Sequence, residues 1–591
     1  MKKRLLASLA SFMFILNTFA GTGSAEPTDS VDPTDVTSAE YGNGSIEIIA
    51  YSPSGEFSPM LQDFFIKNPD LNSKYKVISY RMADPSGNTY DTLCSMLDSK
   101  DKKPDLYISE GAYMYDFIDG DYADYAADYS DFIDNLDSKI KKAELARYSV
   151  EMGTDKSSHI RALSYQSTLS LFYYRRSIAK EVFGTDDPDS VMDEIGGGTG
   201  KWDKFLEACE KMKSKGYAMV SSTGDLWNAS VYGSETPWVV DDTLRLDPER
   251  ANFMDLAKII EDNDYSNHKS VWSYTWYADM NGTGLNDITK EPREVFSFLG
   301  PTWFLYYVIA PQNTSGTYPY GDWGACLAPV SFSWGGYCVS AAKKGVENSS
   351  KKEFISRFVE WITLDTSDTG YQFGYASGLY TTDGTKEAVV SGNVLEKADG
   401  SSDMLAGQDP FPYIKKAGAL APGSYMIPRD YNSIDADFLS SVDQYVSGKL
   451  SREEAFADFQ DIIASYGGID VKSQFVVPDP VLTAPDALPS TVTPTPVPTQ
   501  PPATPTPTVT PAPTDDTDVT DPDDPSTTTS KAKKKKSKKK KVTEPEDPGK
   551  KAIIPAVISV IAFAAVCATV VTIVYVKDNK KKRDQSSSSS K

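Results

Sequence analysis

Strand and helix patterns alternate over the first part of the chain, and this alternation constrains the fold more than any other feature. Residues 45–51 and 75–80 alternate apolar and polar side chains as strands do, and Ser58 marks the start of a helix between them. A helix over 90–97 and a strand over 105–109 follow. Such alternation predicts an α/β fold with a parallel, doubly wound sheet.

Polar side chains follow two of these strands where each strand ends. Ser54 and Glu56 come after the first strand, and Glu110 comes directly after the strand over 105–109. Ligands of doubly wound sheets bind beyond the carboxyl ends of the strands. We therefore expect these three residues to line one edge of a ligand-binding cleft.

An aromatic residue and an amide lie together between two further extended runs, 161–165 and 169–174. Tyr165 offers a ring, and Gln166 offers two hydrogen-bond donors and one acceptor. This combination suits a polar ligand with apolar faces, such as a sugar. The alternative is a buried tyrosine beside an ordinary loop glutamine.

Several tryptophans lie at predicted loop ends, and stacking on their rings suits the C–H faces of a pyranose. Trp227, Trp276, Trp303 and Trp334 are the candidates for such stacking, although core packing is the alternative for each of them. Gly335 follows Trp334 and would let the backbone approach a ligand closely. We expect Trp334 and Tyr165 to face one cleft.

Four segments carry a resemblance to a known family. Residues 161–167 (RALSYQS), 172–179 (FYYRRSIA), 202–208 (WDKFLEA) and 323–341 resemble the extracellular solute-binding proteins of carbohydrate ABC importers, of the Gram-positive type. The similarity covers about residues 45–475 and consists of diffuse signatures. In that family the first segment carries the chain from one lobe to the other across the ligand cleft.

The resemblance implies a two-lobed clamp. Lobe 1 would contain about 45–162 and 324–368, and lobe 2 would contain 163–323 and 369–475. It also implies a carbohydrate ligand, most simply an oligosaccharide, and the membrane subunits of an ABC permease as partners. Closure of the lobes on the ligand would create the form that the permease accepts.

Enzymatic signatures are sparse in this chain. Its two histidines, His159 and His268, are too far apart for a two-histidine zinc helix, so we predict no metal site and no cofactor. Residues 196–201 (GGGTGK) imitate a phosphate loop, but Ile195 replaces its first glycine and Trp202 its Ser/Thr. We predict no catalytic residue, while paired carboxylates keep an extracellular glycosidase open as an alternative.

The N-terminal residues indicate secretion. A basic start, an apolar run over 5–20 and small residues before Ala25 predict a signal peptide over 1–25. Residues 26–44 are polar and read as a disordered leader. The chain has no cysteine before Cys94, so the lipid attachment common in the family is missing. Of the later cysteines, Cys326 and Cys338 could pair.

The C-terminal part indicates a membrane tether. Residues 476–530 are rich in Pro and Thr and read as an extended linker, and 531–551 form a basic juxtamembrane segment. The uncharged run 552–576 is long enough to cross a hydrocarbon layer of ~30 Å, and 577–591 would be a cytoplasmic tail. We expect a single-pass cell-membrane protein whose large N-terminal domain is extracellular.

Charge narrows the possible partners. The formal net charge is −23, so nucleic acid is not expected as a partner. The lysines of 531–541 would either attract an anionic cell-wall polymer or remain simply solvated. The stalk and tether also leave open a glycan-binding surface sensor or adhesin as an alternative to import.

Overall fold

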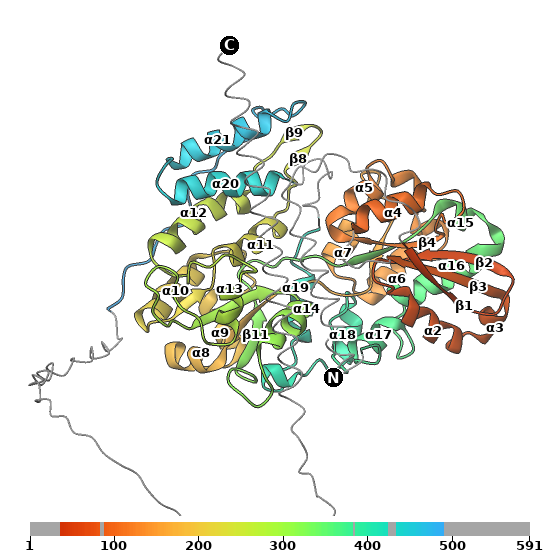
Figure 1. The fold of residues 1–591 in the computed structure, drawn as a ribbon, viewed down its shortest axis with the longest axis horizontal. Coiled ribbons are helices and arrows are strands. Elements are labelled where there is room, and N and C mark those ends of the chain that lie inside the picture. The colour runs from red at the N-terminus through yellow and green to blue at the C-terminus, as the bar shows by residue number, and fades with distance from the viewer. Residues whose placement is uncertain (1–35, 83–87, 382–383, 424–432, 490–591) are drawn as a thin grey trace, which may run out of the picture. The chain divides into compact units, whose positions relative to one another are not determined.

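The structure is a computed structural model that describes residues 36–82, 88–381, 384–423 and 433–489. The chain up to Val497 is one compact unit by its contacts. Within this unit the elements gather around two main sheets, which we call lobe 1 and lobe 2 (Figure 1). A mixed α/β fold with two lobes is what the sequence predicts.

Lobe 1 contains a six-stranded sheet in the order β1-β3-β2-β4-β12-β5. β2 is parallel to both β3 and β4, whereas β1, β12 and β5 join in antiparallel pairs. The parallel centre is the predicted doubly wound part. The strands are β1 (Val36–Tyr41), β2 (Ile46–Tyr51), β3 (Tyr75–Met82), β4 (Leu106–Glu110), β5 (Leu163–Ser164) and β12 (Tyr337–Ala341).

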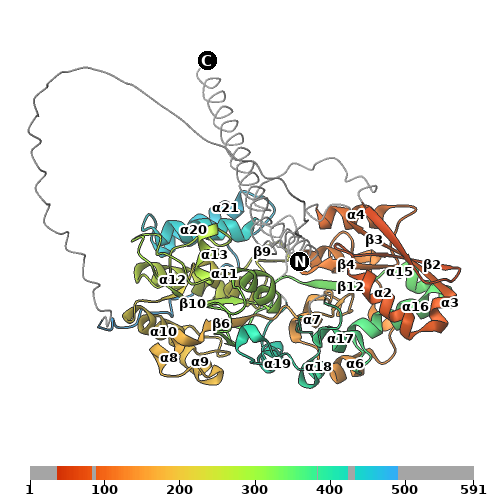
Figure 2. The same cartoon turned by 60° about the horizontal axis from the view of Figure 1, so that its bottom comes forward.

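Helices cover both faces of the lobe 1 sheet (Figure 2). Phe64 lies 5.7 Å from Phe354 and 5.0 Å from Phe358 between ring centroids, which joins α2 to α16 on one face. The helices of this lobe are α2 (Phe57–Lys67), α3 (Pro69–Lys74), α4 (Thr89–Asp98), α5 (Met114–Ile118), α6 (Leu136–Ala143), α7 (Arg147–Met152), α15 (Lys343–Glu347), α16 (Ser349–Thr363) and α17 (Tyr371–Ala376). Short 3-10 turns are η1 (Gly111–Tyr113), η2 (Ala123–Tyr125) and η3 (Tyr129–Asp131).

Lobe 2 contains a four-stranded sheet in the order β11-β6-β10-β7 and a small hairpin, β8-β9. β6 is antiparallel to β10 and β11, and β10 is parallel to β7. The strands are β6 (Leu171–Arg175), β7 (Ala218–Val220), β8 (Val239–Val240), β9 (Thr243–Leu244), β10 (Val295–Gly300) and β11 (Trp323–Leu327).

Helices surround the lobe 2 sheet. α8 ends at Gly184, whose φ of 79° is left-handed, and α21 begins with a capping box of Ser451 and Glu454. They are α8 (Arg176–Phe183), α9 (Pro188–Ile195), α10 (Asp203–Ser214), α11 (Gly224–Tyr232), α12 (Pro248–Asp262), α13 (Tyr274–Met280), α20 (Ile434–Val446) and α21 (Arg452–Ala464).

Two lobe boundaries differ from the expected ones. β11 pairs with β6 in lobe 2, so the second segment of lobe 1 begins after β11 and not at residue 324. α17 packs on α16, and its Tyr371 belongs to the lobe 1 core, although residues from 369 onward were expected in lobe 2. Sequence similarity shows where the chain crosses between the lobes. Hydrogen bonding and packing decide to which lobe the elements on each side of that crossing belong.

The segment that follows Pro301 is helical. α14 (Thr302–Phe304), a π-helical turn η4 (Leu305–Ile309) and a 3-10 turn η5 (Ala310–Gln312) run consecutively. Leu305, Val308 and Ile309 are buried at helical spacing, which explains the apolar composition of the segment. Pi-helical turns occur often at functional sites.

Three extended segments connect the lobes. Leu169 bridges Ser333, and the Trp334 N–H donates to the Thr168 carbonyl at 2.9 Å, so the two predicted crossovers lie side by side. Gln166 bridges Val389, so the third connection, expected near residue 369, lies near residue 389. Beyond it lie α18 (Gly392–Lys397), η6 (Asp403–Leu405) and α19 (Phe411–Gly418).

The leader and the linker are more ordered than expected. β1 lies inside the expected disordered leader 26–44, because its backbone pairs with β3 while its polar side chains stay exposed. At the other end, Leu482 is buried in the lobe 2 core and the Leu488 N–H donates to Glu210 Oε1 at 2.7 Å. The Pro/Thr linker therefore begins after this packed stretch and not at residue 476.

The membrane predictions fall outside the described residues. These are the signal peptide over 1–25, the basic segment 531–551, the apolar run 552–576 and the tail 577–591. Among the helices that the structure does describe, none combines the length and apolarity needed to cross a bilayer.

The four cysteines of the described part are buried, and none of them forms a disulfide within that part. Cys326 belongs to β11 in lobe 2 and Cys338 to β12 in lobe 1. The possible pairing of these two cysteines is therefore not formed. Burial raises the pKa of both thiols, which keeps them protonated and unreactive.

His268 lies between two carboxylates of lobe 2, Glu261 and Asp264, and its Nε2 is 2.8 Å from Asp264 Oδ1. The hydrogen bonds that His268 donates to Asp264 and to Glu261 raise its pKa to about 9. Because the folded pKa exceeds the unfolded value of about 6.5, this stabilisation is complete below pH 6.5 and is lost as pH rises towards 9.

We expect His268→Gln to flatten the pH dependence of stability between pH 6.5 and 9. Urea unfolding at a series of pH values would measure it, with the unchanged protein as reference. An identical slope for both proteins in that window would contradict the assignment.

Candidate functional site

Two carboxylates lie at the carboxyl end of the lobe 1 sheet, as predicted. Glu56 is half-buried just after β2, and it accepts the Ser54 N–H at 3.1 Å. Glu110 ends β4, is 8 % exposed and accepts the Thr89 hydroxyl at 2.5 Å. Burial raises the pKa of Glu110 to about 7, partly opposed by the Thr89 hydrogen bond and increased further by the charge of Glu56.

Tyr337 of β12 links these two carboxylates. Its register partner in the sheet is Glu110, and burial together with the charges of Glu56 and Glu110 raises the pKa of its hydroxyl. Ser54 also forms a hydrogen bond with Tyr337. The four residues therefore belong to one polar patch at the edge of lobe 1.

Aromatic rings of lobe 2 gather around Trp334. The ring centroids of Trp303 and Trp272 lie 5.1 Å and 6.0 Å from that of Trp334, and the Trp303 Nε1–H donates to the Trp334 carbonyl at 3.3 Å. Trp303 and Trp272 are half-buried, whereas Trp334 is 4 % exposed. Trp303 and Trp272 therefore keep part of their ring surfaces available for stacking.

A direct backbone contact joins the polar patch to the aromatic group. The Gly111 N–H, next to Glu110, donates to the Gly336 carbonyl at 2.9 Å. Gly335 has a φ of 73°, and a Cβ added there would meet no atom within 4 Å. The segment between Trp334 and Tyr337 therefore lies between the two carboxylates and the indole rings. The space beside Gly335 is open.

Tyr165 and Gln166 lie in the neighbouring crossover. Tyr165 is buried and meets Tyr371 and Tyr375 edge-on, with centroids 5.6 Å and 5.9 Å away. Gln166 is half-buried, and the Tyr375 hydroxyl lies 3.5 Å from its Oε1. Their crossover lies beside that of Trp334, but Tyr165 packs in lobe 1 and Trp334 in lobe 2. Contact of either residue with a ligand stays a prediction.

The two remaining tryptophan candidates pack in lobe 2. Trp276 is buried beside Trp272, and its Nε1–H donates to Asp225 at 2.9 Å. Trp227 is 7 % exposed and stacks against Phe438. Trp276 therefore packs against the aromatic group from within the lobe 2 core. A binding role for Trp227 stays a prediction, and the site defined by the other residues does not use it.

Two polar residues near the third connection were not predicted from the sequence. The Tyr307 hydroxyl, on the π-helical turn of lobe 2, donates to a Glu387 carboxylate oxygen, and Glu387 raises the pKa of Tyr375 beside Gln166. The aromatic run 303–307 was a signal for Tyr307, but nothing in the sequence distinguished Glu387, which is 7 % exposed, from the other glutamates of the chain.

The patch and the rings can hold a polar solute with apolar faces. Carboxylates accept hydrogen bonds from hydroxyl groups, and indole rings stack on C–H faces. Within the described ranges no group of three or more His, Cys, Asp or Glu side chains could hold a metal ion. Binding is therefore the chemistry that these residues offer most directly.

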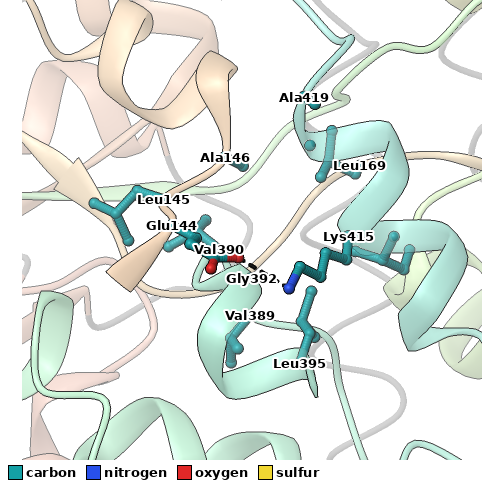
Figure 3. A pocket seen from close by; sticks show the side chains of 12 residues that line it. Glu144, Leu145, Ala146, Leu169, Val389, Val390, Gly392, Leu395, Lys415 and Ala419 are labelled. Atoms are coloured by element: carbon teal, nitrogen blue, oxygen red, sulfur yellow. Dashed lines mark ion pairs between the residues drawn. The ribbon is translucent and has the colours of Figure 1, made fainter. Parts of the chain in front are cut away.

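A separate cavity of about 250 Å³ lies where the connecting segments meet α18 and α19 (Figure 3). Its lining is mostly apolar and includes Leu145, Leu169, Val390 and Ile414. Lys415 lies at its edge and pairs with Glu144 at 2.9 Å. None of the aromatic or carboxylate residues described above lines this cavity, so we do not assign it to the same site.

No known family profile matches the chain, and no curated protein sequence matches it. Among solved structures, an extracellular solute-binding protein of family 1 is similar to it, with a TM-score of 0.54 and 15 % identity over 71 % of this chain and 100 % of the other. A family 1 protein from Alicyclobacillus acidocaldarius has a TM-score of 0.49 and 11 % identity over 72 % of this chain and 99 % of its own.

The lacto-N-biose-binding protein of an ABC transporter from Bifidobacterium longum gives a TM-score of 0.48 and 15 % identity over 72 % of this chain and 99 % of the other. At such identities the similarity concerns the backbone alone. The two sheets, the crossovers between them and the match over the whole length of the first structure agree with one another. The chain therefore has the two-lobed fold of the extracellular solute-binding proteins of family 1.

Proposed function

We propose that this protein captures a carbohydrate, most simply an oligosaccharide, between its two lobes and does not chemically change it. The observation that carries the proposal is the segment Trp334–Tyr337, which places Glu56 and Glu110 on one side and Trp303 on the other. A sugar has both the hydroxyl groups and the C–H faces that this arrangement can bind. Sugar-binding proteins among the similar structures support the same ligand class.

A thermal-shift screen tests this proposal. A fragment of residues 26–497 retains the compact unit with the packed stretch before residue 490. A sugar that binds only the folded form raises the melting temperature, by an amount that grows with ligand concentration. Failure of a broad set of mono- and oligosaccharides to shift it would refute sugar capture. Release of shorter products in a turnover assay would instead indicate a glycosidase.

We also propose that the captured sugar is passed to an ABC permease. Family 1 proteins close their lobes by hinge motion, and the three connections between the lobes provide such a hinge here. A deletion of the permease partner should abolish uptake of the sugar found in the screen. Unchanged uptake would favour a sensor or adhesin that uses the same fold.

The remaining part of the proposal is a membrane tether at the C-terminus. We expect truncation after Asp547 to release the protein into the medium, because the uncharged run 552–576 would be lost. Immunoblots of membrane and medium fractions measure this release. Replacing only the lysines of 531–541 by serine is the matched control and should leave the protein with the membrane. A truncated protein that still fractionates with membranes would show that the anchor lies elsewhere.

A further inference from the structure

The polar side of the proposed site is acidic and has little compensating charge. Neither Glu56 nor Glu110 forms an ion pair with any residue in the described part of the chain. The basic side chain of Arg81 borders Gly55 through its Cδ, 3.0 Å from where a Cβ would lie, but does not pair with either carboxylate. The charge of Glu56 acts on Glu110, and the charges of both glutamates act on the Tyr337 hydroxyl.

A second observation suggests that this patch is built to meet a ligand. Tyr51 is 0 % exposed, and its hydroxyl has no hydrogen-bond partner among the described residues. The charges of Glu56 and Glu110 both act on that hydroxyl. Beside Glu110 there is also a hollow of about 10 Å³, enough for roughly one water molecule, which Thr89 and other residues line as well. The patch thus contains an unsatisfied buried polar group and a small hollow.

We propose that this acidic patch selects the charge of the captured sugar, so that amino sugars bind more tightly than neutral sugars and uronic acids bind most weakly. This inference rests on the proposed function. Ionised carboxylates are acceptors only, so hydroxyl and ammonium groups can bind them, whereas a third carboxylate meets repulsion. At protein-like dielectric, one like charge at this range weakens binding by about 10- to 100-fold.

The order of affinities also depends on pH. The groups that face Glu110 are Glu56, Thr89, Tyr337 and the tyrosines of the hollow, and of these Glu56 is the other carboxylate. Protonation of Glu110 removes one of two negative charges. Binding of a uronic acid should therefore strengthen as pH falls through about 7, while binding of the neutral analogue changes less.

The test uses matched trisaccharides and the full-length protein in a detergent without a sugar head group. Isothermal titration at pH 8 and pH 5.5 compares the neutral, 2-amino and 6-carboxy forms of β-1,4-glucotriose and of α-1,4-galactotriose. At pH 8 we expect the carboxy form to bind at least tenfold more weakly than the neutral form, and the amino form, whose amino group is only partly protonated at that pH, to bind at least as tightly as the neutral form. Equal affinities for the neutral and carboxy forms would overturn this inference and leave sugar capture intact.

Two variants identify the source of the selectivity. Glu110→Gln and Glu56→Gln should each raise the ratio of carboxy to neutral affinity at pH 8 by about tenfold, and Glu110→Gln should also remove the pH dependence. Glu207→Gln, on the exposed side of α10, is the control and should leave the ratio unchanged. A ratio unaffected by either site variant would overturn the assignment. A protein that binds none of the six sugars would overturn the proposed function, and the charge preference with it.

Discussion

Replacing Trp334 by alanine is expected to lower the free energy of unfolding by about 3–5 kcal/mol, because its ring is 4 % exposed and packs against three aromatic rings. Trp303→Ala should cost less stability, since that ring is half-exposed. It should weaken sugar binding by about 5- to 150-fold, if stacking is worth ~1–3 kcal/mol as it is for nucleobases. Urea unfolding and a binding isotherm on each variant measure the two effects separately.

Trp227→Ala is the matched control for both variants. Trp227 is a buried tryptophan of the same lobe, stacked on Phe438 and not in contact with Trp334. Its loss should lower stability by about as much as the loss of Trp334 and leave the affinity of the folded protein unchanged. Unchanged affinity in Trp303→Ala would remove that ring from the site, and reduced affinity in Trp227→Ala would add it.

The second large effect that we expect is a loss of stability when a buried ion pair is broken. Arg452 of α21 donates to Asp255 of α12 through Nε at 2.8 Å and a second guanidinium nitrogen at 3.0 Å, and both side chains are buried. Asp255→Ala should cost about 3–5 kcal/mol of stability, because it leaves the guanidinium buried without its partner. Removing both charges, as in Asp255→Leu with Arg452→Met, should restore most of that loss.

Urea denaturation of the three proteins measures this difference. An exposed pair on the same helix, Lys258 with Asp262, provides the control, and Asp262→Asn should change stability by less than about 1 kcal/mol. A double variant as unstable as Asp255→Ala would show that the shape of the two side chains matters and their charge does not.

Local order in this protein could be predicted from the sequence alone. The strands predicted over 45–51 and 75–80 are observed as Ile46–Tyr51 and Tyr75–Met82, and the helix predicted to start near Ser58 is α2, because side-chain periodicity is a local property. The positions of Glu56 and Glu110 followed as well, because the end of a parallel strand is a local feature with a fixed place in the sheet.

Burial and partners were decided by the tertiary structure. Trp303 and Trp227 were equal stacking candidates from the sequence, yet one is half-exposed beside Trp334 and the other is stacked on Phe438, because their neighbours come from distant segments. The pairing of β11 with lobe 2 and the third connection through Val389 likewise depend on long-range hydrogen bonds. Periodicity reports which face of an element is apolar, and only the packed chain determines what that face meets.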